Sequence, residues 1–170
     1  FYMGWKPEFA ILLAISTVTD FFTGRGIGRT ESARTKKAWL ALSLTVNLGL
    51  LVFFKYLGFL IRTFLGIAEA VGAEPGFDTF DDIILPMGIS FYTFQTLSYT
   101  IDVYRGRTEP EENLARFALF VSFWPQLVAG PVERAKTLIP QLSAMPDLES
   151  ERIRSGLVRI TWGFFKKVVI

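Results

Sequence analysis

Cysteine and histidine are both absent from this sequence of 170 residues. The lack of cysteine excludes disulfides and thiolate chemistry, and it does not favour either redox compartment. The lack of histidine removes the side chain that serves most often as a general base and as a metal ligand. We therefore predict no metal site and no bound cofactor in this chain, and any histidine-dependent step would need a partner.

A large excess of charge of one sign is also missing, because 18 lysines and arginines stand against 16 aspartates and glutamates. The basic residues are spread between apolar runs, whereas a nucleic-acid-binding surface needs one contiguous basic face. This distribution argues against nucleic acid as a partner.

The sequence does contain long uncharged runs, at residues 9–19, 38–54, 83–101 and 117–132. As a helix the third run would reach roughly 28 Å, about the thickness of the hydrocarbon core of a bilayer. The runs predict an all-α membrane protein, a polytopic helical bundle in which residues 1–170 form a single membrane domain. Because the chain begins at Phe1 and stops on the apolar Ile170, we expect a fragment truncated at both ends.

Charged segments between these runs predict an orientation, because basic loops favour the cytoplasmic side. Segment 25–37 holds five basic residues and one acid, and segments 105–116 and 133–142 also carry arginine or lysine. We expect all three on the cytoplasmic side, and the acidic segment 69–82 on the opposite side. The pattern predicts a multi-pass protein.

Two segments combine cations with apolar residues. In 55–68, Lys55 and Arg62 share a helical face, which fits either an interfacial amphipathic helix or the end of one long tilted span. Segment 152–170 carries five cations among apolar residues and fits an interfacial helix on the inner side or the start of another span. Asp20 and Lys55 lie near the ends of predicted spans, where we expect their charges to snorkel to the interface.

The run 83–104 is polar for a helix that faces lipid, since an unsatisfied hydroxyl or amide in hydrocarbon is costly. We expect it to pack against other helices or along a wet cavity, and we favour interhelical hydrogen bonding over substrate contact. At its end, Asp102 is expected to pair with Arg105, three residues on. The polar side chains of this run are Ser90, Tyr92, Thr93, Gln95, Thr96, Ser98, Tyr99 and Thr100.

The run "FVSFWPQLVAGPVER", Phe120 to Arg134, is interrupted by two prolines, a glycine and a glutamine. Both flanks of the uncharged run 117–132, which contains most of this stretch, are predicted cytoplasmic, and its sixteen residues cannot cross a bilayer twice. We predict a re-entrant element that breaks at Trp124–Pro125 and returns through Gly130–Pro131; a single kinked helix is the alternative. Broken backbone at membrane depth must line a cavity or lie inside protein, so Pro125, Gly130 and Pro131 are candidate cavity-shaping residues.

Three separated blocks, "LPMGISFYTFQTLSYTIDVYRG", "NLARFALFVSFWPQLVAGPVERAKTLIPQL" and "GLVRITWGFFKKVVI", together resemble the membrane-bound O-acyltransferase (MBOAT) family. The similarity lies with its bacterial branch that acetylates alginate and other exopolysaccharides, and it extends over nearly the whole chain. It implies a multi-pass enzyme of the bacterial inner membrane that passes an acyl group to a cell-surface polysaccharide. The donor would be acetyl-CoA or another acetyl carrier, with membrane lipid and periplasmic or extracellular polysaccharide-modifying proteins as partners.

The resemblance also implies a catalytic histidine that this chain lacks. We expect that histidine beyond the position of Ile170, so we assign no catalytic residue and expect the chain alone to be inactive. Polarity and position make Tyr92, Gln95, Gln126 and Arg134 candidates for contact with substrate along its path. Half of a transporter or flippase, or a membrane scaffold without chemistry, are the alternative functions.

Overall fold

The computed structural model describes residues 7–72, 85–86, 88–129, 133–144 and 149–169, and within these ranges the chain contains helices and no strand. The predicted helical class is therefore correct. In chain order the helices are α1 (Glu8–Arg29), α2 (Ala33–Leu51), a π-helical turn (Val52–Tyr56), α3 (Leu57–Ala70), α4 (Ile89–Tyr104), α5 (Leu114–Val121), α6 (Trp124–Ala129), α7 (Ala135–Ser143) and α8 (Ser150–Val169).

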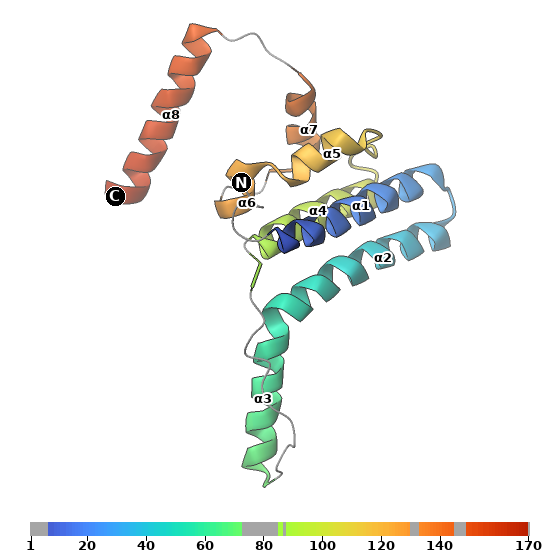
Figure 1. Ribbon diagram of the computed structural model, residues 1–170. Coiled ribbons are helices and arrows are strands. Elements are labelled where there is room, and N and C mark those ends of the chain that lie inside the picture. Colours follow the sequence, from blue (N-terminus) through green and yellow to red (C-terminus); the bar gives the residue numbers. More distant parts are fainter. Residues whose placement is uncertain (1–6, 73–84, 87, 130–132, 145–148, 170) are drawn as a thin grey trace.

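Helices α1, α2 and α4 pack on one another and form the centre of the described structure (Figure 1). Helix α1 has an acid, Glu8, in its first turn and a base, Arg29, in its last, which suits the helix dipole. Gly24 allows a close approach of α1 to α4, because a Cβ atom there would lie 2.7 Å from the hydroxyl oxygen of Tyr99. A larger residue at this position would push the two helices apart.

The core continues from α4 into α5 through aromatic contacts. The ring of Phe117 lies 4.6 Å from that of Tyr99 and 6.1 Å from that of Phe21, measured between centroids. All three side chains are buried. Helix α5 is thereby fixed to both α1 and α4.

Within the part of the chain that the structure describes, two helices are long and apolar enough to cross a membrane. They are Glu8–Arg29, with a mean hydropathy of 1.3, and the continuous helix Ala33–Ala70, with a mean hydropathy of 1.9. Helix α3 follows α2 without interruption, and the helix changes direction at the π-helical turn, as Figure 1 shows. Segment 55–68 is therefore part of a bent helix. The predicted crossing at 83–104 contains α4, which has 16 residues.

The chain is interrupted between α5 and α6, but not at the predicted position. Helix α5 ends at Val121 and α6 begins at Trp124, so the break lies at Ser122–Phe123 instead of Trp124–Pro125. Pro125 sits in the first turn of α6, where a missing backbone N–H costs nothing. Gly130 and Pro131 lie outside the described residues.

Candidate functional site

A carboxylate lies at the centre of the three-helix packing. Asp20 of α1 has no exposed surface. Its Oδ1 accepts hydrogen bonds from the Ser43 hydroxyl and from Thr100 Oγ1, the latter at 2.9 Å, and its Oδ2 accepts one from Asn47 Nδ2 at 2.7 Å. The expectation that Asp20 snorkels to the interface is therefore wrong. Donors from α2 and α4 take the place of water, so the carboxylate remains in the interior.

The hydrogen-bond network extends from Asn47 toward the other end of the helices. Asn47 Oδ1 accepts from Ser16 Oγ at 2.5 Å and from Thr96 Oγ1 at 3.4 Å. Each of α1, α2 and α4 thus contributes polar atoms to one buried network. For Thr96 and Thr100 the preference for interhelical hydrogen bonding is confirmed.

A second polar contact joins α4 to the interrupted segment. Gln95 Nε2 donates to the Phe120 carbonyl at 2.8 Å and to Gln126 Oε1 at 3.2 Å. Gln126 Nε2 donates in turn to the carbonyl of Glu133 at 3.3 Å. Both glutamine side chains are buried. The structure therefore brings together two of the four predicted substrate-path residues.

The other two substrate-path candidates lie in different surroundings. Tyr92 is fully buried in the apolar core, one turn before Gln95 on α4. Arg134 is exposed at the start of α7, where its backbone carbonyl accepts from the amides of Thr137 and Leu138. The structure does not bring the side chain of Arg134 to the glutamine pair.

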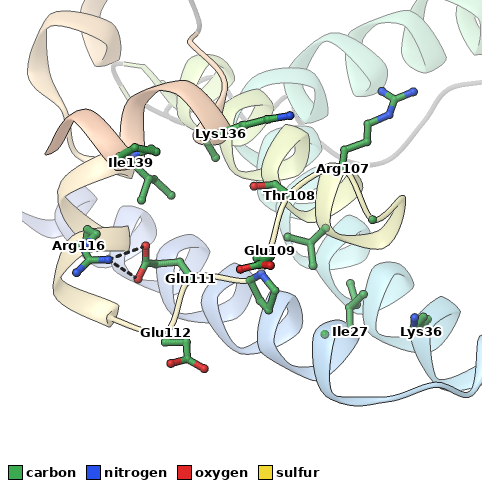
Figure 2. A pocket seen from close by; sticks show the side chains of 16 residues that line it. Ile27, Lys36, Arg107, Thr108, Glu109, Glu111, Glu112, Arg116, Lys136 and Ile139 are labelled. Carbon is green, nitrogen blue, oxygen red and sulfur yellow. Dashed lines mark hydrogen bonds and ion pairs between the residues drawn. The ribbon is translucent and has the colours of Figure 1, made fainter. Parts of the chain in front are cut away.

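A cavity of about 970 Å³ opens where the end of α1, the segment after α4, α5 and α7 meet (Figure 2). Its charged lining residues come from all three of the segments 25–37, 105–116 and 133–142, which the sequence analysis expects on one side of the membrane. These residues are Lys36, Arg107, Glu109, Glu111, Glu112, Arg116 and Lys136.

Glu111 fixes the wall of this cavity. Its backbone N–H donates to the Tyr99 hydroxyl at 2.9 Å, and its carboxylate accepts from the backbone N–H of Asn113 at 2.9 Å. Arg116 Nη1 lies 3.4 Å from the same carboxylate, as the dashed lines in Figure 2 show. The backbone turn between α4 and α5 is therefore tied to the buried face of α4.

The cations at the cavity differ in their pairing. Arg116 pairs with Glu111, and Arg107 pairs with Asp102 at 3.7 Å. The predicted pairing of Asp102 with Arg105 is therefore wrong, because the chain turns after Tyr104 and carries Arg107 back to the carboxylate. Lys36 and Lys136 have no ion pair with any residue that the structure describes.

The chain is similar in sequence to several known proteins. No family model and no solved structure matches the chain. Over its whole length it is 41% identical to a probable alginate O-acetylase of Azotobacter vinelandii, of which it covers 34%. It is also 41% identical to a probable alginate O-acetylase of Pseudomonas aeruginosa, of which it covers 32%. This similarity extends over the whole chain and agrees with the resemblance to the membrane-bound O-acyltransferase family.

A relative with a different named acceptor is similar over the same range. A peptidoglycan O-acetyltransferase of Helicobacter pylori is 35% identical over the whole chain, which covers 36% of that protein. The chain thus spans about a third of the length of the curated relatives it matches.

Sequence reasoning missed the role of two sets of residues in this chain. The sequence analysis did not connect Asp20 with the side chains that donate hydrogen bonds to it. Two of these donors, Ser43 and Asn47, stand four residues apart and so share a face of α2. The cavity was also missed, although its three charged segments were assigned to one side. That assignment was the signal from which a shared site could have been inferred.

Proposed function

We propose that this chain forms part of a multi-pass O-acyltransferase of the bacterial cytoplasmic membrane that transfers an acetyl group to a cell-surface polysaccharide such as alginate. The observation that carries the proposal is the 41% identity, over the whole chain, to two probable alginate O-acetylases. The peptidoglycan O-acetyltransferase among the relatives has a different glycan acceptor. The shared chemistry is ester formation on a sugar hydroxyl.

The proposed topology places segments 25–37, 105–116 and 133–142 together on the cytoplasmic side, in a single membrane domain. Residues from these segments line one cavity, which supports a common side for them. The positive-inside rule supplies the direction. Helix α3 lies at the opposite side of the membrane from this cavity in the proposed arrangement.

The acetyl donor, acetyl-CoA or another acetyl carrier, is proposed to approach from the cavity side. Lys36 and Lys136 line the cavity and lack an ion-pair partner among the described residues, so they are available to an anionic group of the donor. Cations at such a position attract a charged ligand and raise its local concentration. This arrangement supports binding of the donor and assigns no chemical step to these lysines.

The interrupted segment is proposed to be re-entrant and to border the substrate path, with Pro125, Gly130 and Pro131 shaping it. A helix end at membrane depth exposes carbonyl groups that need donors. The Gln95 side chain donates to the Phe120 carbonyl, and the Gln126 side chain of α6 donates to the Glu133 carbonyl. This pairing supports a polar strip beside Tyr92, along which an acyl group or an acceptor hydroxyl would pass, with Arg134 at its exposed end.

Transfer also needs a general base near the acceptor hydroxyl. The chain contains no histidine. We therefore place the base in the two thirds of the relatives' length that this chain does not match, and we propose that periplasmic or extracellular polysaccharide-modifying proteins act downstream. In this view the chain supplies the walls and the entrance of the site.

The experiment is deletion of the gene that encodes this chain, complementation with variants, and measurement of ester-linked acetate on the surface polysaccharide by NMR. Wild-type complementation should restore acetylation. Gln95→Ala and Gln126→Ala should each lower it by roughly tenfold or more at equal protein level in the membrane, because each leaves buried polar groups without partners. Phe94→Leu is the matched control, since Phe94 is the exposed neighbour on α4.

An unchanged acetate content in the deletion strain would overturn the proposed function. Normal acetylation by both glutamine variants would refute the substrate path while leaving the enzymatic proposal in place. Equal loss in Phe94→Leu would show that α4 as a whole, and not its polar strip, is required.

A further inference from the structure

Helix α8 has no buried residue and stands apart from the bundle of α1, α2 and α4 (Figure 1). It has twenty residues, enough to cross a bilayer, but it is not among the described helices that are apolar enough to do so. Five cations and one carboxylate, Glu151, account for this. An amphipathic helix of this length that packs on none of the other described helices requires another partner for its apolar side chains.

Three of the five cations of α8 lie on a different face from its main apolar stripe. Arg152, Arg159 and Lys166 repeat every seven residues, which is close to two helical turns, so they form one basic row. The apolar residues recur at spacings of four and three and form the opposite stripe; they include Ile153, Leu157, Ile160 and Phe164. All four are at least half exposed.

Aromatic side chains of α8 lie close to the basic row. The rings of Trp162 and Phe165 stack with centroids 5.4 Å apart, and Lys166 Nζ lies 5.4 Å from the centroid of the Trp162 ring. Tryptophan and lysine in contact are typical of the headgroup level of a membrane, where an aromatic body meets apolar chains and the cation meets phosphate.

We propose that α8 lies flat in the membrane interface and binds an anionic lipid leaflet. The stripe of Leu157 and Phe164 enters the boundary between headgroups and acyl chains, and the cations attract anionic headgroups. The excess of cations over carboxylates makes the helix complementary in charge to an anionic surface and not to a neutral one. The proposal concerns lipid binding and does not depend on the proposed acetyl transfer.

The absence of cysteine allows a direct test. In a cysteine-free background of the full gene product, single cysteines are placed at Leu157 and Phe164 on the apolar stripe and at Ser155 on the polar side, and each carries a bimane label. The protein is reconstituted in phosphatidylcholine vesicles with chain-brominated lipid, with or without phosphatidylglycerol. Quenching of bimane fluorescence by bromine reports contact with acyl chains.

We expect strong quenching at positions 157 and 164 and weak quenching at 155, with an increase of about twofold at 157 when phosphatidylglycerol is present. Arg159→Gln should remove that increase. Arg154→Gln is the control on the same helix, because Arg154 lies outside the basic row and pairs with Glu151 at 3.9 Å, and it should leave the increase intact.

Three outcomes would overturn the proposal. Equal quenching at 155 and 157 would show a helix that spans the bilayer. Little quenching at all three positions would show a helix covered by protein. Strong quenching at 157 and 164 that does not change with phosphatidylglycerol would show interfacial placement without selectivity for anionic lipid.

Discussion

Replacing Asp20 by alanine should strongly destabilise the packing of α1, α2 and α4. The carboxylate accepts three hydrogen bonds from Ser43, Asn47 and Thr100, and alanine leaves all three donors without it in a buried junction. Interhelical hydrogen bonds in membrane proteins contribute about 0.6 kcal/mol on average and up to roughly 1.7. Three such bonds predict a loss of about 2 to 5 kcal/mol in the free energy of unfolding.

Asp20→Asn should lower the free energy of unfolding by less, about 1 kcal/mol. The asparagine amide keeps one oxygen as an acceptor, but its NH₂ group replaces the other oxygen and faces a hydrogen-bond donor. The measurement is reversible unfolding of the full gene product in mixed micelles by titration with sodium dodecyl sulfate, followed by circular dichroism. Thr63→Ala is the control, because Thr63 is exposed and its hydroxyl donates to the Phe59 carbonyl of its own helix, at 2.8 Å, with no bond to another described helix. The reasoning fails if Asp20→Ala unfolds within about 0.5 kcal/mol of this control.

Two further substitutions test contacts that hold the site together. Gly88 has a φ angle of +75°, and a Cβ atom there would lie 2.6 Å from the Leu127 carbonyl oxygen. Gly88→Ala should therefore destabilise the contact of α4 with α6, by roughly 1 to 3 kcal/mol in the same unfolding assay. A neutral result would mean that α6 can move away from α4 freely. Glu111→Gln should loosen the cavity wall, because it weakens the contacts of this side chain with Asn113 and Arg116. Proteolysis after Arg116 should then be about threefold faster. Unchanged cleavage would show that the contact of the Glu111 backbone with Tyr99 alone holds the turn.

The sequence alone was sufficient for the helical class and for the resemblance to membrane-bound O-acyltransferases. The uncharged run 9–19 lies inside α1, and the run 38–54 lies inside α2 and the π-helical turn that follows it, because a long apolar stretch in hydrocarbon must satisfy its backbone hydrogen bonds internally. Both helices begin before these runs, and α1 continues to Arg29, ten residues beyond its run. The three blocks that resemble the MBOAT family lie in a chain that is 41% identical to two alginate O-acetylases. The sequence also marked Gln95 and Gln126 as polar residues in unusual surroundings.

Tertiary structure decided where the polar groups go. Helices α1 and α2 are apolar on most sides, so hydrophobic periodicity does not show which side of each faces the other. Asp20 therefore reads from sequence as a residue near a span end, whereas its donors come from positions 23, 27 and 80 residues further along the chain. The rotation of three helices about their axes brings these atoms together, and a local pattern does not encode that rotation.

The same distinction holds for the break and the cavity. A proline signals that a helix is interrupted nearby, but it is equally compatible with the first turn of a new helix, which is where Pro125 lies. The charges at the cavity were visible in the sequence as three separate segments on one side. Only the packing of α5 and α7 beside α1 and α4 brings them around one space, because long-range contacts between helices depend on the fit of their side chains and not on local sequence.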